Sequence, residues 1–123
     1  MDEYLYSQEH FWFLQEPGGA VRFGITGNLM LPGVLEFVQL PRKGETFEAD
    51  STLGCLETDK CTVDIRLPFA VKIVQVNEIW CTDPQKLLDG DMDAKWLCKV
   101  ELLHGASLAG LLTAHQYDDF CNP

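Results

Sequence analysis

The sequence is poor in basic residues and has no long apolar run. It carries nine Lys and Arg against 19 Asp and Glu, which gives a formal net charge of −10 at pH 7. Phosphate groups repel a chain this acidic, so we expect neither nucleic acids nor anionic lipid surfaces as partners. No run approaches the roughly 18 apolar residues of a membrane helix, and the acidic first residues do not resemble a secretory signal. The sequence therefore favours a cytoplasmic protein whose charge aids solubility or docking onto basic partners.

The sequence also lacks the short motifs that mark common catalytic and metal sites. It contains no G-x-S-x-G, no H-E-x-x-H and no phosphate-binding loop. No two of its five cysteines have the C-x-x-C spacing of zinc and thioredoxin-type sites: Cys55, Cys61, Cys81, Cys98 and Cys121. We expect no catalytic residue, no metal site and no disulfide framework. We interpret most of the cysteines as small buried hydrophobic residues.

Length and composition are those of an ordinary globular domain. The 123 residues are 46% hydrophobic and 23% charged, and a chain of this length forms one domain with a core of its own. We therefore expect a single domain over residues 1–123, with its core over about 6–103. We also expect it to act as a monomer.

Short β-rich runs separated by turns dominate the chain. The alternation of apolar and polar residues is clearest over 61–67, where Val63, Ile65 and Leu67 share one face. The expected strands span residues 6–13, 21–25, 34–40, 46–49, 52–58, 61–67, 69–76 and 96–102. Residues 84–88 resemble a short helix that ends near Gly90, and 107–120 resemble an amphipathic C-terminal helix with Ser107 as N-cap. This pattern predicts a mostly β fold, a small antiparallel sandwich or flattened barrel with one terminal helix.

One predicted hairpin presents a lysine at its tip. Residues 52–58 and 61–67 flank Asp59 and Lys60, which are left as a two-residue turn. Neither residue suits a glycine-dependent primed turn, so a type I turn is expected. Nothing local buries Lys60, and a solvated lysine is the commonest outcome at such a position. From the residues alone, Lys60 is therefore either an ordinary surface lysine or a presented one.

Several motifs in order resemble the glycine cleavage system H protein family. They comprise residues 6–12, 23–26, 33, 37–41 with Gly44, 54–60 and 96–100, followed by a C-terminal helix with Tyr117. Within them, Glu57-Thr58-Asp59-Lys60 resembles a lipoyl-attachment motif. The resemblance covers residues 6 to 120 and implies a lipoyl/biotinyl-type hybrid barrel-sandwich whose hairpin bears lipoate in an amide bond on Lys60. It implies a non-catalytic carrier that a lipoate ligase or lipoyl transferase modifies, with Glu57 and Asp59 as part of the attachment motif and Glu57 as the acid such enzymes read.

Departures from the family pattern leave the client enzymes open. Val34 stands where an acid is common, Ala70 where a glycine is usual, and residues 89–95 lack the expected Pro and Gly. Asp59 and Cys61 also replace more typical residues. These changes favour a specialised paralogue that serves sulfur oxidation with a heterodisulfide-reductase-like complex. The alternatives are the H protein of glycine cleavage, a lipoyl-relay paralogue linked to redox defence, and a non-lipoylated interaction module.

The glycine cleavage alternative implies a defined set of partners. The carrier would take the aminomethyl group from glycine decarboxylase, pass it to the aminomethyltransferase and be reoxidised by dihydrolipoamide dehydrogenase. A carrier of either kind needs no acid or base of its own, which agrees with the missing catalytic motifs.

Two further residues are candidates for direct roles. Cys61 adjoins Lys60, so its thiol could exchange with a dithiol on the arm if it ionises. His10 lies among aromatic residues, where a packed or hydrogen-bonded histidine is the commoner outcome than a functional one.

Overall fold

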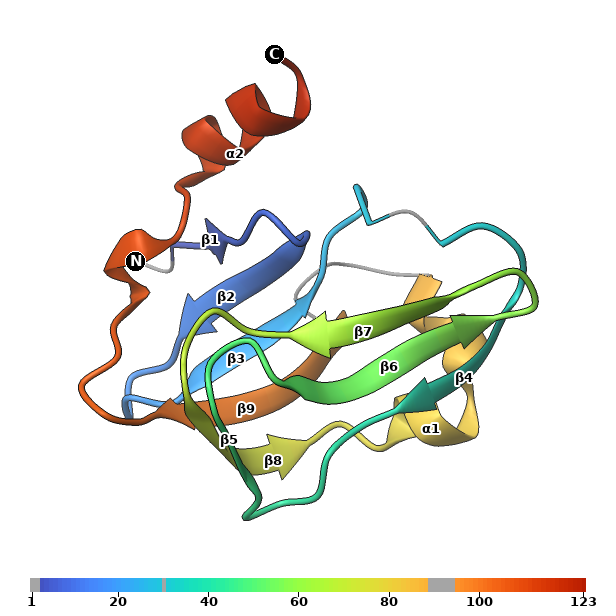
Figure 1. Ribbon diagram of the computed structural model, residues 1–123, viewed down its shortest axis with the longest axis horizontal. Helices are drawn as coiled ribbons and strands as arrows, with labels where there is room; N and C mark the ends of the chain where they lie inside the picture. The colour runs from blue at the N-terminus through green and yellow to red at the C-terminus, as the bar shows by residue number, and fades with distance from the viewer. Residues whose placement is uncertain (1–2, 30, 89–94) are drawn as a thin grey trace.

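The computed structural model describes residues 3–29, 31–88 and 95–123 (Figure 1). Strands alternate with turns along most of the chain, and two short helical segments precede the last strand. The elements are β1 (Leu5–Tyr6), β2 (Phe11–Gln15), β3 (Val21–Ile25), β4 (Leu35–Gln39), β5 (Thr46–Phe47), β6 (Thr52–Thr58), β7 (Thr62–Arg66), β8 (Val71–Val76), α1 (Ile79–Thr82), η1 (Pro84–Leu88, a 3₁₀ helix), β9 (Trp96–Leu102), η3 (Leu108–Gly110, a 3₁₀ helix) and α2 (Ala114–Cys121).

The strands form two antiparallel sheets. A six-stranded sheet has the order β1-β2-β3-β9-β8-β5, and a three-stranded sheet has the order β4-β6-β7. The second sheet lies across the first, and its β6–β7 hairpin extends away from the molecule on the side opposite the turn that joins β7 to β8 (Figure 1). The mostly β sandwich with a C-terminal helix that the sequence predicts is confirmed.

A single hydrophobic core fills the space between the two sheets. The six-stranded sheet contributes alternate side chains of β2, β3 and β8 together with side chains of β9, and the three-stranded sheet contributes side chains from each of its strands. The least exposed of these are Phe13, Val21, Phe23, Leu56, Val71, Ile73, Leu97, Cys98 and Val100. Alternation along half-buried strands explains this pattern, because successive side chains point to opposite faces.

Several elements differ from the sequence expectation. The strand expected over 6–13 is interrupted by a turn at residues 7–10, where His10 has a φ of 74°, and only then does β2 begin. Helix α1 is an element that the sequence did not predict. The 84–88 helix is present as η1, while Gly90 lies outside the described residues.

The expected helix over 107–120 is two elements instead of one. Ser107 caps the 3₁₀ helix η3, where its side chain accepts a hydrogen bond from the Ala109 amide. The chain is then extended at Leu111, and α2 begins after Thr113, which forms a capping box with Gln116. Two N-cap signals six residues apart therefore produce two short helices in place of one long helix.

Tyr117 connects α2 to the six-stranded sheet. Its ring stacks on Tyr6 with centroids 4.5 Å apart. Its hydroxyl makes hydrogen bonds to Thr26 Oγ1 at 2.7 Å and His10 Nδ1 at 2.6 Å, and it accepts a longer one from Asn28 at 3.5 Å. Burial raises the pKa of this hydroxyl, because the ionised form would lose hydration. The terminal helix is therefore fixed by one buried polar cluster.

Two classes of feature are missing from the described residues. No helix among them is long and apolar enough to cross a membrane. Within 3–29, 31–88 and 95–123, no group of three or more His, Cys, Asp or Glu side chains could hold a metal ion. The five cysteines are all unpaired, and Cys98 alone among them is buried, so the interpretation of most of them as buried residues is wrong.

We expect Tyr117→Phe to lower the free energy of unfolding by about 1–3 kcal/mol, since Thr26 and His10 lose a buried hydrogen-bond partner. Denaturant unfolding of the two proteins measures the difference. Tyr6→Phe is the matched control, because its contact with Tyr117 is made by the ring, which the substitution keeps. Equal stability of Tyr117→Phe and the parent protein would contradict this account.

Candidate functional site

The tip of the β6–β7 hairpin is a tight turn with Lys60 at its apex. The Thr58 amide donates to the Cys61 carbonyl at 2.8 Å, which leaves Asp59 and Lys60 as the two turn residues. The non-glycine residues with positive φ in the described part are His10, Asp50 and His104, so neither turn residue is left-handed. This geometry agrees with the expected type I turn and excludes a primed turn.

A buried threonine organises the turn from beneath. Thr58 is 6% exposed. Its Oγ1 accepts hydrogen bonds from the amides of Lys60 and Cys61, each at 3.0 Å, and donates to the Pro32 carbonyl at 2.7 Å. One hydroxyl thus satisfies two turn amides and joins the hairpin to the segment before β4.

Asp59 makes the second connection to that segment. Its amide donates to the Val34 carbonyl at 3.2 Å, and its Oδ1 accepts from the Val34 amide at 2.7 Å. The carboxylate is therefore directed towards Val34, and Lys60 forms no ion pair with any residue that the structure describes. The two connections, made by Thr58 and Asp59 to residues 32–34, are called the tip clamp below.

Gly33 allows the tip clamp to close. Its φ of +90° is a left-handed conformation that favours glycine. A Cβ at this position would collide with Asp59 Oδ1 and would lie 2.6 Å from Lys60 Cγ. The backbone at residue 33 therefore passes directly under the turn, with no room for a side chain.

The other attachment-motif residues lie at the same end of the hairpin. Glu57 is exposed on β6, opposite Phe37 of β4 and Thr62 of β7. Cys61 is half-buried, and the Thr58 hydroxyl lies 3.6 Å from its sulfur. The structure thus brings Glu57, Asp59, Lys60 and Cys61 together.

His10 is not part of this group. It sits in the turn between β1 and β2, which is separated from the hairpin tip in Figure 1. Its ring contacts Tyr117 edge-on, at a centroid distance of 5.7 Å, and packs near Phe120 at 6.3 Å. The structure gives His10 a role in holding α2.

The surroundings of the tip are acidic. Glu36, Glu57, Asp59 and Asp64 are all exposed here. Burial raises the pKa of the neighbouring Cys55 thiol, and the charges of Glu57 and Asp64 raise it further. The negative field therefore opposes ionisation of the Cys55 thiol.

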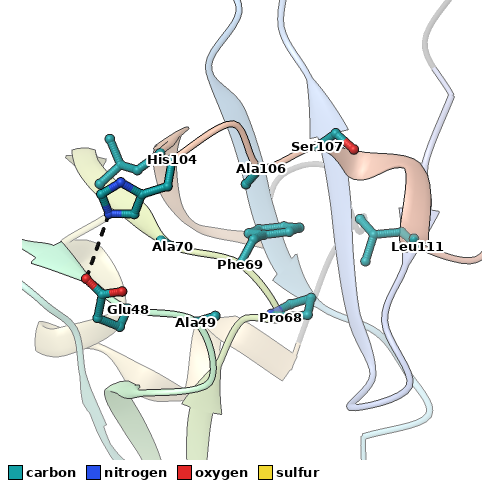
Figure 2. A pocket seen from close by; sticks show the side chains of 11 residues that line it. Glu48, Ala49, Pro68, Phe69, Ala70, His104, Ala106, Ser107 and Leu111 are labelled. Carbon is teal, nitrogen blue, oxygen red and sulfur yellow. Dashed lines mark ion pairs between the residues drawn. The ribbon is translucent and has the colours of Figure 1, made fainter.

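A separate cavity of about 440 Å³ lies at the other end of the hairpin. Pro68, Phe69 and Leu111 give it an apolar lining, and an ion pair between His104 and Glu48 at 3.8 Å borders it (Figure 2). Residues 48–49 precede β6 and residues 68–70 follow β7, so the length of β6 separates the cavity from Lys60, a span of roughly 20 Å. The cavity is not part of the lysine site.

Sequence reasoning missed the residues that hold the lysine in place. Pro32 and Thr58 were not singled out, and Gly33 was noted only for the family pattern. A threonine directly before a turn is a known signal for side-chain bonds to the following amides. The partner segment, 24 to 26 residues earlier in the chain, gives no comparable signal.

The observed site suits a covalently attached group. Lys60 is exposed, and the neighbouring Asp59 carboxylate is hydrogen-bonded to the Val34 amide. The Lys60 amide itself donates to Thr58 Oγ1, so the backbone of the turn is held in place. The lysine amine is therefore accessible to a second protein. The turn that carries it is already ordered, so little conformational entropy is lost on binding.

Comparisons with known proteins agree with this geometry. The family model "Glycine cleavage H-protein" matches residues 4–123. Glycine cleavage system H proteins from Bacillus mycoides (strain KBAB4) and Bacillus cereus (strain G9842) are each 36% identical to the chain over 121 residues, covering 95% of it and 92% of each relative. The crystal structure of a glycine cleavage system H protein from Mycobacterium marinum superposes with a TM-score of 0.80 at 33% identity, covering 95% of this chain and 94% of that one. The chain therefore belongs to the glycine cleavage H-protein family, and it is a non-catalytic carrier of covalently attached lipoate.

Proposed function

We propose that Lys60 is the lipoylated residue and that the carrier serves glycine breakdown. The observation that carries the first part is the tip clamp, which presents an exposed lysine without an ion-pair partner among the described residues. The names of the relatives support the second part, since those reported above are all H proteins of the glycine cleavage system.

Attachment requires little from the chain beyond presentation. The Lys60 amine would lose a proton and attack the carboxyl carbon of lipoate that an ATP-dependent ligase has activated as its adenylate. An amide forms and AMP leaves. Thr58 and Asp59 hold the backbone of the turn, so the amine starts from a fixed root and less conformational entropy is lost on contact.

The bound group supplies the chemistry that the protein lacks. A lipoyl group would provide a disulfide that can be reduced and a dithiol that can hold a one-carbon amine. Glycine decarboxylase, an aminomethyltransferase and dihydrolipoamide dehydrogenase are the partners that this function implies, together with a lipoate ligase or lipoyl transferase. Because activation consumes ATP and all five thiols are unpaired, we place the protein in the cytoplasm.

The expectation of a sulfur-oxidising client is not supported. It depended on departures from the family pattern, but the family match covers residues 4–123 and the reported relatives are glycine cleavage proteins. One departure also has a structural explanation, because the Asp59 side chain is used inside the tip clamp. Attachment of lipoate to Lys60 also distinguishes a carrier from a non-lipoylated interaction module.

Incubation of the apo-protein with a lipoate–protein ligase, lipoate, Mg²⁺ and ATP is expected to add one lipoyl group at Lys60. Intact mass and peptide mapping measure the product. Lys60→Arg should abolish the modification, because arginine does not form the amide. Lys72→Arg, at an exposed position of β8, is the matched control and should be modified like the parent protein. No modification of the parent protein would overturn the proposed function.

The same holo-protein then identifies the client. It should support glycine-dependent exchange of CO₂ by glycine decarboxylase, and Lys60→Arg should not. Activity only with a heterodisulfide-reductase-like complex would instead favour the sulfur-oxidation alternative.

Gly33→Ala is expected to lower kcat/KM for lipoylation about tenfold, because its Cβ displaces Asp59 and the root of Lys60. Initial rates of modification measure the loss. Gly19→Ala is the matched control, since Gly19 has a similar φ of +97° but nothing within 4 Å of the added Cβ. Equal rates for both variants and the parent protein would show that the tip clamp does not control attachment.

The proposed thiol exchange at Cys61 can be tested on the holo-protein. If the thiol takes part, Cys61→Ser should change the rate at which dihydrolipoamide dehydrogenase reoxidises the reduced arm. Unchanged transfer and reoxidation rates would exclude a role for this cysteine.

A further inference from the structure

An exposed phenylalanine lies on the strand beside the lysine. Four large hydrophobic side chains are exposed in the described part of the protein, among them Phe37 at 63% and Val34 at 56%. Val34 is part of the tip clamp, and Phe37 lies on β4 directly opposite Glu57. Exposed apolar residues that gather at one place commonly mark an interaction surface.

A β-bulge produces this exposure. Leu35 pairs with Thr58 and Phe37 pairs with Glu57, so Glu36 is an extra residue with no partner on β6. In a regular strand, residues 35 and 37 would point to the same face. The bulge instead lets Leu35 point into the core, at 2% exposure, while Phe37 points outward. Bulges that redirect a side chain are common beside functional sites.

Phe37 borders a groove between β4 and α1. The groove has a volume of about 460 Å³ and is lined by Phe37, Val38, Gln39, Leu40, Glu57 and Cys81. Cys81 comes from α1, which lies along β4 (Figure 1). We call this feature the Phe37 groove.

The free edge of β4 is already covered. Both α1 and η1 pack against β4, and the Gln85 side chain donates to the Leu35 carbonyl at 2.6 Å. A partner strand is therefore not expected to extend this sheet at β4. The Phe37 groove is instead suited to a side chain that projects from a folded partner.

The charge beside Lys60 indicates the chemistry of that partner. Glu36 and Glu57 flank Phe37, and both are exposed. Basic residues Arg42 and Lys43 occur only farther along, in a second hollow that shares Leu40 and Cys81 with the groove. The end nearest Lys60 is therefore negative and complements a positively charged surface.

We propose that the Phe37 groove docks the enzyme that lipoylates Lys60, through an apolar side chain of that enzyme flanked by Lys or Arg. The inference rests on the proposed attachment at Lys60. An enzyme that encloses a lysine buries roughly 800 Å² of its partner, more than a two-residue turn provides. Contact must extend onto a neighbouring surface, and Val34 and Phe37 supply exposed apolar area next to the turn.

Steady-state lipoylation of Phe37→Thr by a lipoate–protein ligase tests the proposal. The KM for the apo-protein should rise about tenfold with kcat little changed, because binding is weakened while Lys60 stays in place. Phe37→Tyr retains the aromatic ring and should restore the parent KM. Phe120→Ala is the matched control, since Phe120 is a 45% exposed phenylalanine on α2.

A charge series tests the second element of the proposal. Glu36→Gln should raise the KM about threefold at low salt, and the difference should shrink as salt is added. Glu48→Gln, at the opposite end of the hairpin, should behave as the parent protein. Thermal melting of each variant confirms that it is folded.

The outcomes separate this inference from the proposed function. Modification of the parent protein with equal KM for Phe37→Thr and Phe120→Ala overturns the docking surface and leaves attachment at Lys60 intact. Failure of the parent protein to accept lipoate overturns both.

Discussion

The hydroxyl of Thr58 is the contact on which the presentation of Lys60 depends. It is buried, and it serves two turn amides and the Pro32 carbonyl at once. A buried polar group without partners costs about 1–3 kcal/mol. Removing this hydroxyl would take a partner from the Pro32 carbonyl and from the amides of Lys60 and Cys61 at the same time. The turn is thus held by tertiary contacts as well as by its own local geometry. A hairpin tip that lacked them would present the lysine on a mobile loop.

A carrier must bury enough to fold while it exposes the residues that its partners contact. The bulge at Glu36 resolves this conflict on β4, because Leu35 reaches the core while Phe37 remains outside. The tip clamp resolves it at the turn, where Thr58 is buried and Lys60 is exposed two residues later. In both places a local irregularity breaks the alternation of a regular strand. The sheets make the domain rigid, and the two irregularities leave Phe37 and Lys60 accessible to partner proteins.

The sequence predicted those parts of the site that depend on neighbouring residues. Alternation over 61–67 and the Asp59-Lys60 pair were enough to predict the hairpin and its type I turn. The segment of residues 32–34 could not be placed beneath that turn, because its contacts join residues 25 and 26 positions apart. The position of His10 against α2 was missed for the same reason, since its partner Tyr117 is 107 residues away. The continuous helix expected over 107–120 was wrong because apolar spacing alone does not reveal the second N-cap at Thr113.

The tip clamp also determines which departures from the family pattern a partner can detect. Asp59 directs its carboxylate to the Val34 amide, so this acid contributes to the shape of the turn and less to recognition. Val34 uses only its backbone in the clamp, and its side chain remains exposed next to Lys60. A partner that approaches the lysine from the β4 side would therefore meet Val34, Phe37 and Glu57 as one surface. Client preference in this carrier should accordingly depend more on the side chains of β4 and the segment before it than on the turn residues themselves.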